Sequence, residues 1–261
     1  MNEYGFSQGI ARNASQSEYP HLWRGLVGLW SPRAGTQGQK LVDYVNRRDG
    51  TLTNGPEWQS GRFGWSLNFD GTNDYVATPG ISYGLSGNCT FLAWVNAAAL
   101  DANVRAAVVS EQAANYWVFL GGSGTAGQVQ FALFDGTNNP KAAAAATVGK
   151  WIFLAGVRKS GNIILYVDGI QAATTADTTT SVPAYSAFNI GSQITVARRW
   201  SGKIGDVRIY NRALSAAEIM QSYMGASPLV RAVTTFGKSV SAAATAIFRN
   251  RTGSRSRLIS S

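Results

Sequence analysis

Residues 65–76 read WSLNFDGTNDYV, and this stretch decides the fold. Apolar residues alternate with polar ones from Trp65 to Phe69, a period of two that predicts a half-buried β-strand. Asp70-Gly71 then interrupts the run, because glycine accepts the positive φ that a tight turn needs. Asp74-Tyr75-Val76 begins a second strand. The stretch therefore predicts a β-hairpin whose turn gathers polar side chains.

The composition fits one large all-β domain. The chain has 261 residues, of which 45% are hydrophobic and only 14% charged, and it contains 29 glycines. This amount of apolar material can form a sizeable core, and the glycines suit frequent turns. The one cysteine, Cys89, cannot form an intrachain disulfide. Met1–Ile10 lacks the pattern of a secretory signal, and no segment is apolar enough to span a membrane.

A regular series of strands is expected on both sides of residues 65–76. Each predicted strand is bounded by Gly, Asn, Asp or Pro, and several are apolar on both faces, as expected inside a two-sheet sandwich. The expected strands are Gly25–Trp30, Thr90–Asn96, Arg105–Ser110, Tyr116–Leu120, Gln128–Phe134, Trp151–Arg158, Asn162–Val167, Phe188–Gln193 and Lys203–Tyr210.

Three connections complete this prediction. Asp168-Gly169 indicates a second hairpin turn. The alanine run Ala142–Ala146 lies between turn residues and is expected to be a loop or a short strand, and Thr174–Ser181 a threonine-rich connection.

A helix start signal follows the last predicted strand. Ser215 and Glu218 have the spacing of a capping box, in which each side chain bonds the other residue's backbone N–H. The pattern predicts a short helix at Ala216–Met224 that ends at Gly225, since glycine is the usual residue after a helix C-terminus.

Two motifs carry a family resemblance. The sequence FDGTNDYV at 69–76 and the sequence IGDVRIYNRALSAAEI at 204–219 resemble the opening and closing motifs of laminin-G-like, concanavalin A-like domains. The resemblance implies an all-β, two-sheet antiparallel jelly-roll sandwich with one short C-terminal helix. The expected domain spans residues 25–225, between an N-terminal arm at 1–24 and a basic C-terminal arm at 226–261.

The sequence argues against an enzyme. His21 is the only histidine and stands before the first predicted strand, so a Ser-His-Asp or Cys-His set would have no other candidate base, and no histidine cluster can hold zinc. Glycosidases need two suitably spaced carboxylates. Glucanases that share this sandwich carry an E-x-D-x-x-E strand, which this chain lacks. We therefore predict a non-enzymatic protein that needs no cofactor.

Calcium is the one ion that the first turn would suit. Asp70, Asn73 and Asp74 bring hard oxygen ligands together, and some members of the resembled family bind calcium. The alternative is that these side chains only hydrogen-bond their own turn. An acidic residue often precedes the Asp206 position in the family, but this chain has Gly205 there. We favour the alternative for that reason.

Tryptophans offer a possible glycan platform. Trp94, Trp117 and Trp151 lie in strongly apolar predicted strands, which favours a place in the core. Trp200 instead lies in the polar stretch 198–202, which leaves two alternatives, a place in the core or an exposed ring able to contact a glycan.

The C-terminal arm carries most of the excess charge. The net charge is +9, and residues 229–261 contribute six basic residues and no acidic one: Arg231, Lys238, Arg249, Arg251, Arg255 and Arg257. Nucleic-acid binding is disfavoured, because the charges are dispersed and few aromatics lie among them. A solvated tail is one alternative, and an arm that orders on a neighbouring protein is the one we favour.

Two functional hypotheses follow. The arms and the family resemblance suggest a bacteriophage virion structural protein, a capsid decoration or cement protein that would bridge major capsid or other virion proteins. It would lie on the capsid surface in multiple copies or as a homo-oligomer, away from membranes. The alternative is a carbohydrate-binding module, with or without calcium, for example one that attaches a virion or cell to host glycans.

Overall fold

The computed structural model divides the chain into two compact units. One unit is Gly25–Met224, and the other comprises Met1–Arg24 and Gly225–Ser261. The terminal unit contains helix α2, Pro20–Trp23. The structure describes residues 19–79, 87–101, 107–113, 116–180, 188–193 and 198–225.

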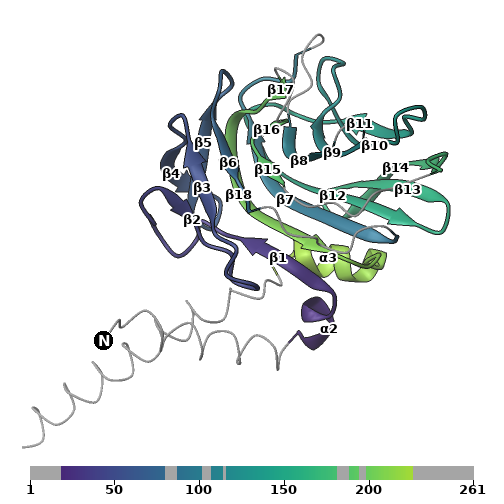
Figure 1. Ribbon diagram of the computed structural model, residues 1–261, viewed down its shortest axis with the longest axis horizontal. Coiled ribbons are helices and arrows are strands. Elements are labelled where there is room, and N and C mark those ends of the chain that lie inside the picture. Colours follow the sequence, from purple (N-terminus) through teal and green to yellow (C-terminus); the bar gives the residue numbers. More distant parts are fainter. Residues whose placement is uncertain are drawn as a thin grey trace, which may run out of the picture. The chain divides into compact units, whose positions relative to one another are not determined.

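Sheet I is one of two large antiparallel sheets in the unit Gly25–Met224 (Figure 1). It has the order β14-β13-β12-β7-β18-β5-β4, and β1 also pairs with β18. Its strands are β1 (Leu26–Trp30), β4 (Glu57–Gly61), β5 (Gly64–Asp70), β7 (Cys89–Ala97), β12 (Trp151–Lys159), β13 (Asn162–Val167), β14 (Ile170–Ala176) and β18 (Ser201–Tyr210).

Sheet II packs against it and has the order β11-β10-β9-β8-β15-β6-β3-β2. Its strands are β2 (Lys40–Leu41), β3 (Gly50–Thr53), β6 (Tyr75–Ala77), β8 (Ala107–Ala113), β9 (Tyr116–Gly122), β10 (Gln128–Phe134), β11 (Lys141–Ala145) and β15 (Asn189–Ile190). A two-stranded ribbon, β16 (Ser192–Gln193) with β17 (Arg198–Arg199), adds a third sheet. The expected all-β, two-sheet antiparallel sandwich is confirmed.

The core between the sheets follows the alternation of side chains along each strand. On β7, Phe91, Ala93 and Val95 belong to the main buried cluster, together with residues of sheet II such as Phe131 and Leu133. Residues of β7 with the other parity, such as Trp94, lie outside that cluster and face the opposite side of sheet I. That opposite side is called here the outer face of sheet I.

The opening stretch 65–76 does not form a hairpin, and this prediction was wrong. β5 pairs with β4 and β18 in sheet I, whereas β6 pairs with β3 and β15 in sheet II. The turn, with Gly71 at φ 80°, therefore carries the chain from one sheet to the other. Alternation with a tight turn is common to both arrangements, so local sequence alone does not distinguish them.

Other local predictions hold with adjusted limits. β13 and β14 form the hairpin expected at Asp168-Gly169, where both turn residues have positive φ, 50° and 81°. The alanine run is a strand, β11. The threonine-rich connection is shorter than expected, because β14 continues through Ala176.

The helix after β18 covers part of the outer face of sheet I. Helix α3 spans Ala216–Tyr223, and the predicted capping box of Ser215 and Glu218 is present. Tyr223 stacks on Trp94 with ring centroids 5.7 Å apart, so α3 lies on the side of sheet I away from sheet II (Figure 1). Within the part of the chain that the structure describes, no helix has the length and apolarity to cross a bilayer.

Candidate functional site

A bulge in β18 shapes the outer face of sheet I. The pairing of β18 with β7 shifts register between Ile204 and Val207, and this irregularity contains Gly205 and Asp206. A bulge re-aims the side chains beside it and locally increases the twist of the strand. Gly205 has no side chain, and a Cβ added there would lie 3.3 Å from Cβ of Trp94 and 3.7 Å from Cζ3 of Trp151. The missing side chain therefore leaves a narrow hollow between the Cβ of Trp94 and the edge of the Trp151 indole.

Aromatic rings surround this hollow. Trp94, which is 1% exposed, contacts Phe63 edge-on at 5.4 Å between centroids and Phe153 at 5.2 Å. Such offset and edge-on arrangements suit the ring quadrupoles and hold the rings rigidly. Phe63 comes from the turn between β4 and β5 and remains 37% exposed. Trp151, at the start of β12, is half-buried. The rings of Phe63 and Trp151 are therefore accessible from solvent.

Two arginines lie over these rings. The guanidinium carbon of Arg62 is 4.4 Å from the centroid of Trp94 and 5.2 Å from that of Phe63. The guanidinium carbon of Arg33 lies 4.3 Å from the centroid of the Phe63 ring. Cation–π contacts of this kind orient a guanidinium without consuming its hydrogen-bond donors. The planar ends of both side chains thus lie against the aromatic rings of the site.

Asp206 anchors this region through a buried network. Its Oδ1 accepts hydrogen bonds from Oγ of Ser31 at 2.6 Å and from Nε of Arg33 at 2.8 Å. Its Oδ2 lies 2.7 Å from Nη2 of Arg33 and 3.2 Å from Nη2 of Arg208. Burial alone would raise the pKa of Asp206, but the attraction of the two guanidiniums outweighs it and lowers the pKa. Asp206 is therefore a structural carboxylate and not a proton donor at neutral pH.

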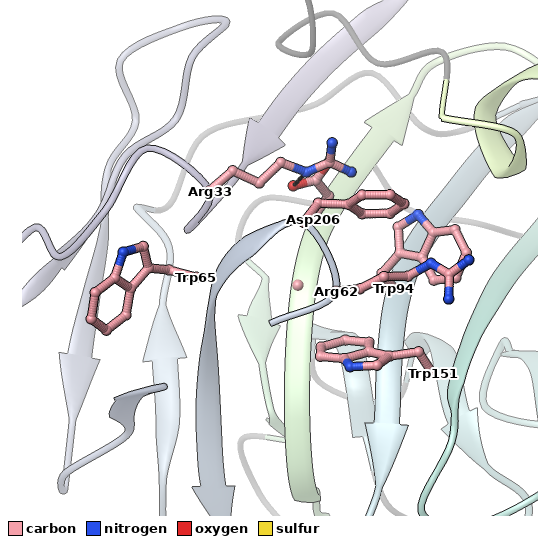
Figure 2. Close-up of a pocket in the computed structure, with 8 residues that line it drawn as sticks. Arg33, Arg62, Trp65, Trp94, Trp151 and Asp206 are labelled. Carbon is pink, nitrogen blue, oxygen red and sulfur yellow. Dashed lines mark hydrogen bonds and ion pairs between the residues drawn. The ribbon is translucent and has the colours of Figure 1, made fainter. Parts of the chain in front are cut away.

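These groups line a shallow depression with a cavity volume of about 10 Å³, room for little more than one water molecule. Pockets that bury a drug-sized ligand measure about 300–1,000 Å³, so a ligand here would lie on the surface over these residues and would not be enclosed. In Figure 2, Trp94 and Trp151 lie on one side of the depression, and the ring of Trp65 points away from them. The lining residues are Arg33, Arg62, Phe63, Trp65, Trp94, Trp151, Gly205 and Asp206.

A polar row continues from the depression across sheet I. Strand register places Trp151 beside Asn96, Asn96 beside Lys203, and Lys203 beside Asn68. Residues paired in this way share a face of the sheet. Lys203 Nζ donates a hydrogen bond to the Ser60 carbonyl at 3.2 Å. The outer face thus offers an accessible indole next to amide and ammonium donors.

The predicted calcium ligands hydrogen-bond their own turn. Oδ1 of Asp70 accepts the N–H groups of Thr72 and Asn73 at 2.7 and 3.3 Å, and Oδ2 of Asp74 accepts the N–H of Asp70 at 3.0 Å. Asp74 is buried, whereas Asp70 and Asn73 are exposed. Among the described residues no three His, Cys, Asp or Glu side chains gather as a metal site. The geometry matches an Asx-type turn, the alternative that the sequence favoured.

The structure contradicts the possibility that Trp200 is exposed and contacts a glycan. Its side chain is 0% exposed and belongs to the main buried cluster, so its ring cannot stack on a glycan from solvent. Polar neighbours suggested exposure, but Ser201 begins β18 and the backbone N–H of Trp200 bonds the Gly191 carbonyl, which holds this segment against the core.

The other tryptophans were expected in the core. Trp94 is buried as predicted, but on the outer face of sheet I and not between the sheets. Trp151 is half-buried on that same face, and the side chain of Trp117 is outside the described residues. The signal for Trp94 was available, since it has the opposite parity to Phe91, Ala93 and Val95. The sequence could not show which of the two sets of alternate side chains on β7 faces sheet II. Arg33, Arg62, Phe63 and Gly205 carried no sequence signal for a site.

The basic C-terminal residues Arg231, Lys238, Arg249, Arg251, Arg255 and Arg257 lie outside the described residues. Their predicted role as an assembly arm therefore stays a prediction.

Fold and site together define a concanavalin A-like sandwich with an aromatic, cationic depression on one sheet. Residues 70–220 match the model of the Laminin_G_3 family, described as the concanavalin A-like lectin/glucanases superfamily. This match covers more than half of the chain, so the chain belongs to that family. No curated protein matches the sequence.

Solved structures share the fold. Domain 4 of AbnA, a GH43 extracellular arabinanase from Geobacillus stearothermophilus in complex with arabinotriose, aligns with a TM-score of 0.62 and 18% identity, over 75% of this chain and 97% of that one. The botulinum neurotoxin serotype D binding domain aligns with a TM-score of 0.60 and 14% identity, and the binding domain of Paraclostridial Mosquitocidal Protein 1 with 0.61 and 14%. The alignments cover 77% and 76% of this chain but only 51% and 52% of those toxin domains. At such identities the likeness concerns the fold.

Proposed function

We propose that this domain is a non-catalytic carbohydrate-binding module whose site is the depression around Gly205. The observation that carries the proposal is the pair Trp94 and Trp151 beside Gly205, with only Trp151 accessible and the polar row next to it. The apolar face of a sugar ring packs on an aromatic face, and its hydroxyls need donors and acceptors at the rim. Trp151 supplies the ring face, and Asn96 and Lys203 supply the rim.

The chemistry of the site favours binding over catalysis. A glycosidase needs a protonated carboxyl group beside the scissile bond and a second carboxylate near it. Asp206 is the only carboxylate among the residues lining the depression, and its pKa is lowered by its two arginine partners. The family and the fold are compatible with a binding role, since the aligned structures include an arabinanase domain in complex with arabinotriose and toxin binding domains.

A panel of oligosaccharides tests the proposal. The full-length protein should retain at least one of them in affinity electrophoresis or calorimetry, and Trp151→Ala should abolish retention. Trp58→Ala is the matched control, because Trp58 is also half-buried but packs against the core between the sheets. Both variants must keep a cooperative thermal transition. Binding that survives Trp151→Ala, or no binding to any glycan of a broad panel, contradicts the proposal.

The capsid decoration role is a second candidate, favoured by the six basic and no acidic residues in 229–261. Such an arm would suit an acidic coat surface, and linked weak contacts gain from effective concentration. On this proposal the protein sits on a virion surface in several copies. Imaging of particles with and without the protein tests it, and release from particles by high salt is the expected result, since salt screens exposed ion pairs.

A further inference from the structure

We infer that the sugar residue bound at the depression is anionic, carrying a carboxylate or a sulfate. The inference rests on the proposed function and specifies the ligand class of that same site. Its basis is the balance of charge around Gly205, which is positive and only partly compensated.

Arg62 is the central cation. Its side chain is exposed, lines the depression and contacts the rings of Trp94 and Phe63. Within the part of the chain that the structure describes, its guanidinium has no ion pair and no hydrogen bond. Since cation–π contact leaves the N–H groups in the guanidinium plane free, Arg62 can offer them to an oxyanion in a two-point geometry.

The groups around Arg62 add positive charge. Arg33 and Arg208 both contact the carboxylate of Asp206, at 2.7 and 3.2 Å. Lys203 bonds the Ser60 carbonyl on β4, the strand that leads into Arg62, and forms no ion pair with any described residue. Arg33 and Arg62 thus line the depression, and neither Arg62 nor the neighbouring Lys203 has an ion pair with a described residue.

The polar row continues from Lys203 through Asn68 to the carboxylate of Glu57. Glu57 is beside Asn68 at the edge strand β4, and Asn68 separates it from Lys203 in the polar row. Its carboxylate accepts a hydrogen bond from Gln59 at 3.2 Å. No described carboxylate is thus within ion-pair distance of Arg62 or Lys203, and a bound sugar anion would supply the missing negative charge beside low-dielectric rings, where screening is weak.

Two variants that each remove one positive charge, Arg62→Gln and Arg47→Gln, test the inference in the full-length protein. Short uronate oligosaccharides, sulfated oligosaccharides and neutral arabino- and gluco-oligosaccharides are titrated by calorimetry. We expect binding of at least one anionic class, and a loss of about tenfold or more in Arg62→Gln, because a hydrogen bond to a charged group is lost. Arg62→Lys should recover part of it.

Arg47→Gln is the control, since Arg47 is exposed, lies outside the depression and changes the net charge equally. It separates the site from non-specific attraction by the basic chain, which Arg47→Gln and Arg62→Gln would weaken alike. Equal affinity for neutral and anionic sugars, both lost in Trp151→Ala, would overturn the inference while leaving the proposed function intact. Binding of acidic peptides but of no sugar would overturn both.

Discussion

Arg33 and Asp206, which are 173 positions apart in the chain, form a two-point ion pair beneath the candidate site. The side chain of Asp206 is 1% exposed and that of Arg33 9%. The pair connects the segment after β1 to the bulge of β18. Both residues line the depression, so this contact holds two of its lining segments together.

Asp206→Asn should therefore destabilise the protein strongly. Removing one partner of a buried pair leaves the arginine charges uncompensated, which costs about 3–5 kcal/mol. Urea unfolding of the purified protein gives this value. Glu57→Gln is the control, because Glu57 is exposed and its replacement should change the free energy of unfolding by about 0.5 kcal/mol or less. Equal effects of the two variants would mean that the Asp206 pair is not structural.

Acid should weaken the fold in a defined window. The pKa of Asp206 is lowered by its arginine partners against the opposing effect of burial, and Glu218 has a pKa of about 2 in the same balance, with Arg212 as its partner. A lowered folded-state pKa gives stability that is present above the unfolded value of about 4 and is lost as pH falls through the folded value. Asp74 has a raised pKa and contributes with the opposite sign.

We expect the free energy of unfolding to be nearly constant from about pH 7 to about pH 5 and to fall below about pH 4. Denaturant titrations across this range measure it. In Asp206→Asn the fall should be shallower, because one of the titrating groups is gone. An unchanged slope in that variant would contradict the assignment.

Gly205→Ala should weaken ligand binding more than stability. The added Cβ would lie 3.3 Å from Cβ of Trp94, which is tight, and would occupy the hollow beside Trp151. We expect a loss of sugar affinity of roughly tenfold, or about 1.4 kcal/mol. Gly87→Ala is the matched control, since a Cβ there meets no atom within 4 Å. Unchanged affinity in Gly205→Ala would place the sugar elsewhere.

Calcium should not affect thermal stability. The carboxylates of Asp70 and Asp74 already accept backbone N–H groups, and Gly205 stands where the family often has an acidic residue. Melting curves in chelator and in millimolar calcium should coincide. A ligand at 100 times its dissociation constant would add about 2.7 kcal/mol, so a rise of several degrees would show a calcium site.

Local sequence predicted the strands, turns and the helix better than it predicted which strands pair with each other. The capping box of Ser215 and Glu218 and the turn at Asp168-Gly169 depend on neighbours in the chain, and both predictions hold. The turn at Asp70-Gly71 was misassigned because pairing with β18 depends on residues about 130 positions away. Such long-range pairing leaves no mark in an alternating pattern.

The candidate site was harder to predict from the sequence than the strand pairing. A two-sheet sandwich has strands that are apolar on both faces wherever a helix or loop covers the outer one, so Trp94 under α3 reads like a core residue. Trp200 follows two arginines, a context typical of the surface, although it is buried. Arg62 joins the site only because the turn between β4 and β5 folds over Trp94, a contact between distant segments.

Truncation after Gly225 separates the two candidate roles of the protein. The main buried cluster extends from Trp30 to Ile209, within the compact unit Gly25–Met224, so the truncated chain should melt within a few degrees of the full-length protein. It should also keep its affinity for sugar, because every residue of the depression remains. If the basic arm secures the protein on a virion, the truncated form should fail to join particles. Normal attachment of the truncated form would exclude the arm as the anchor, and a large drop in melting temperature would show that residues 226–261 belong to the fold.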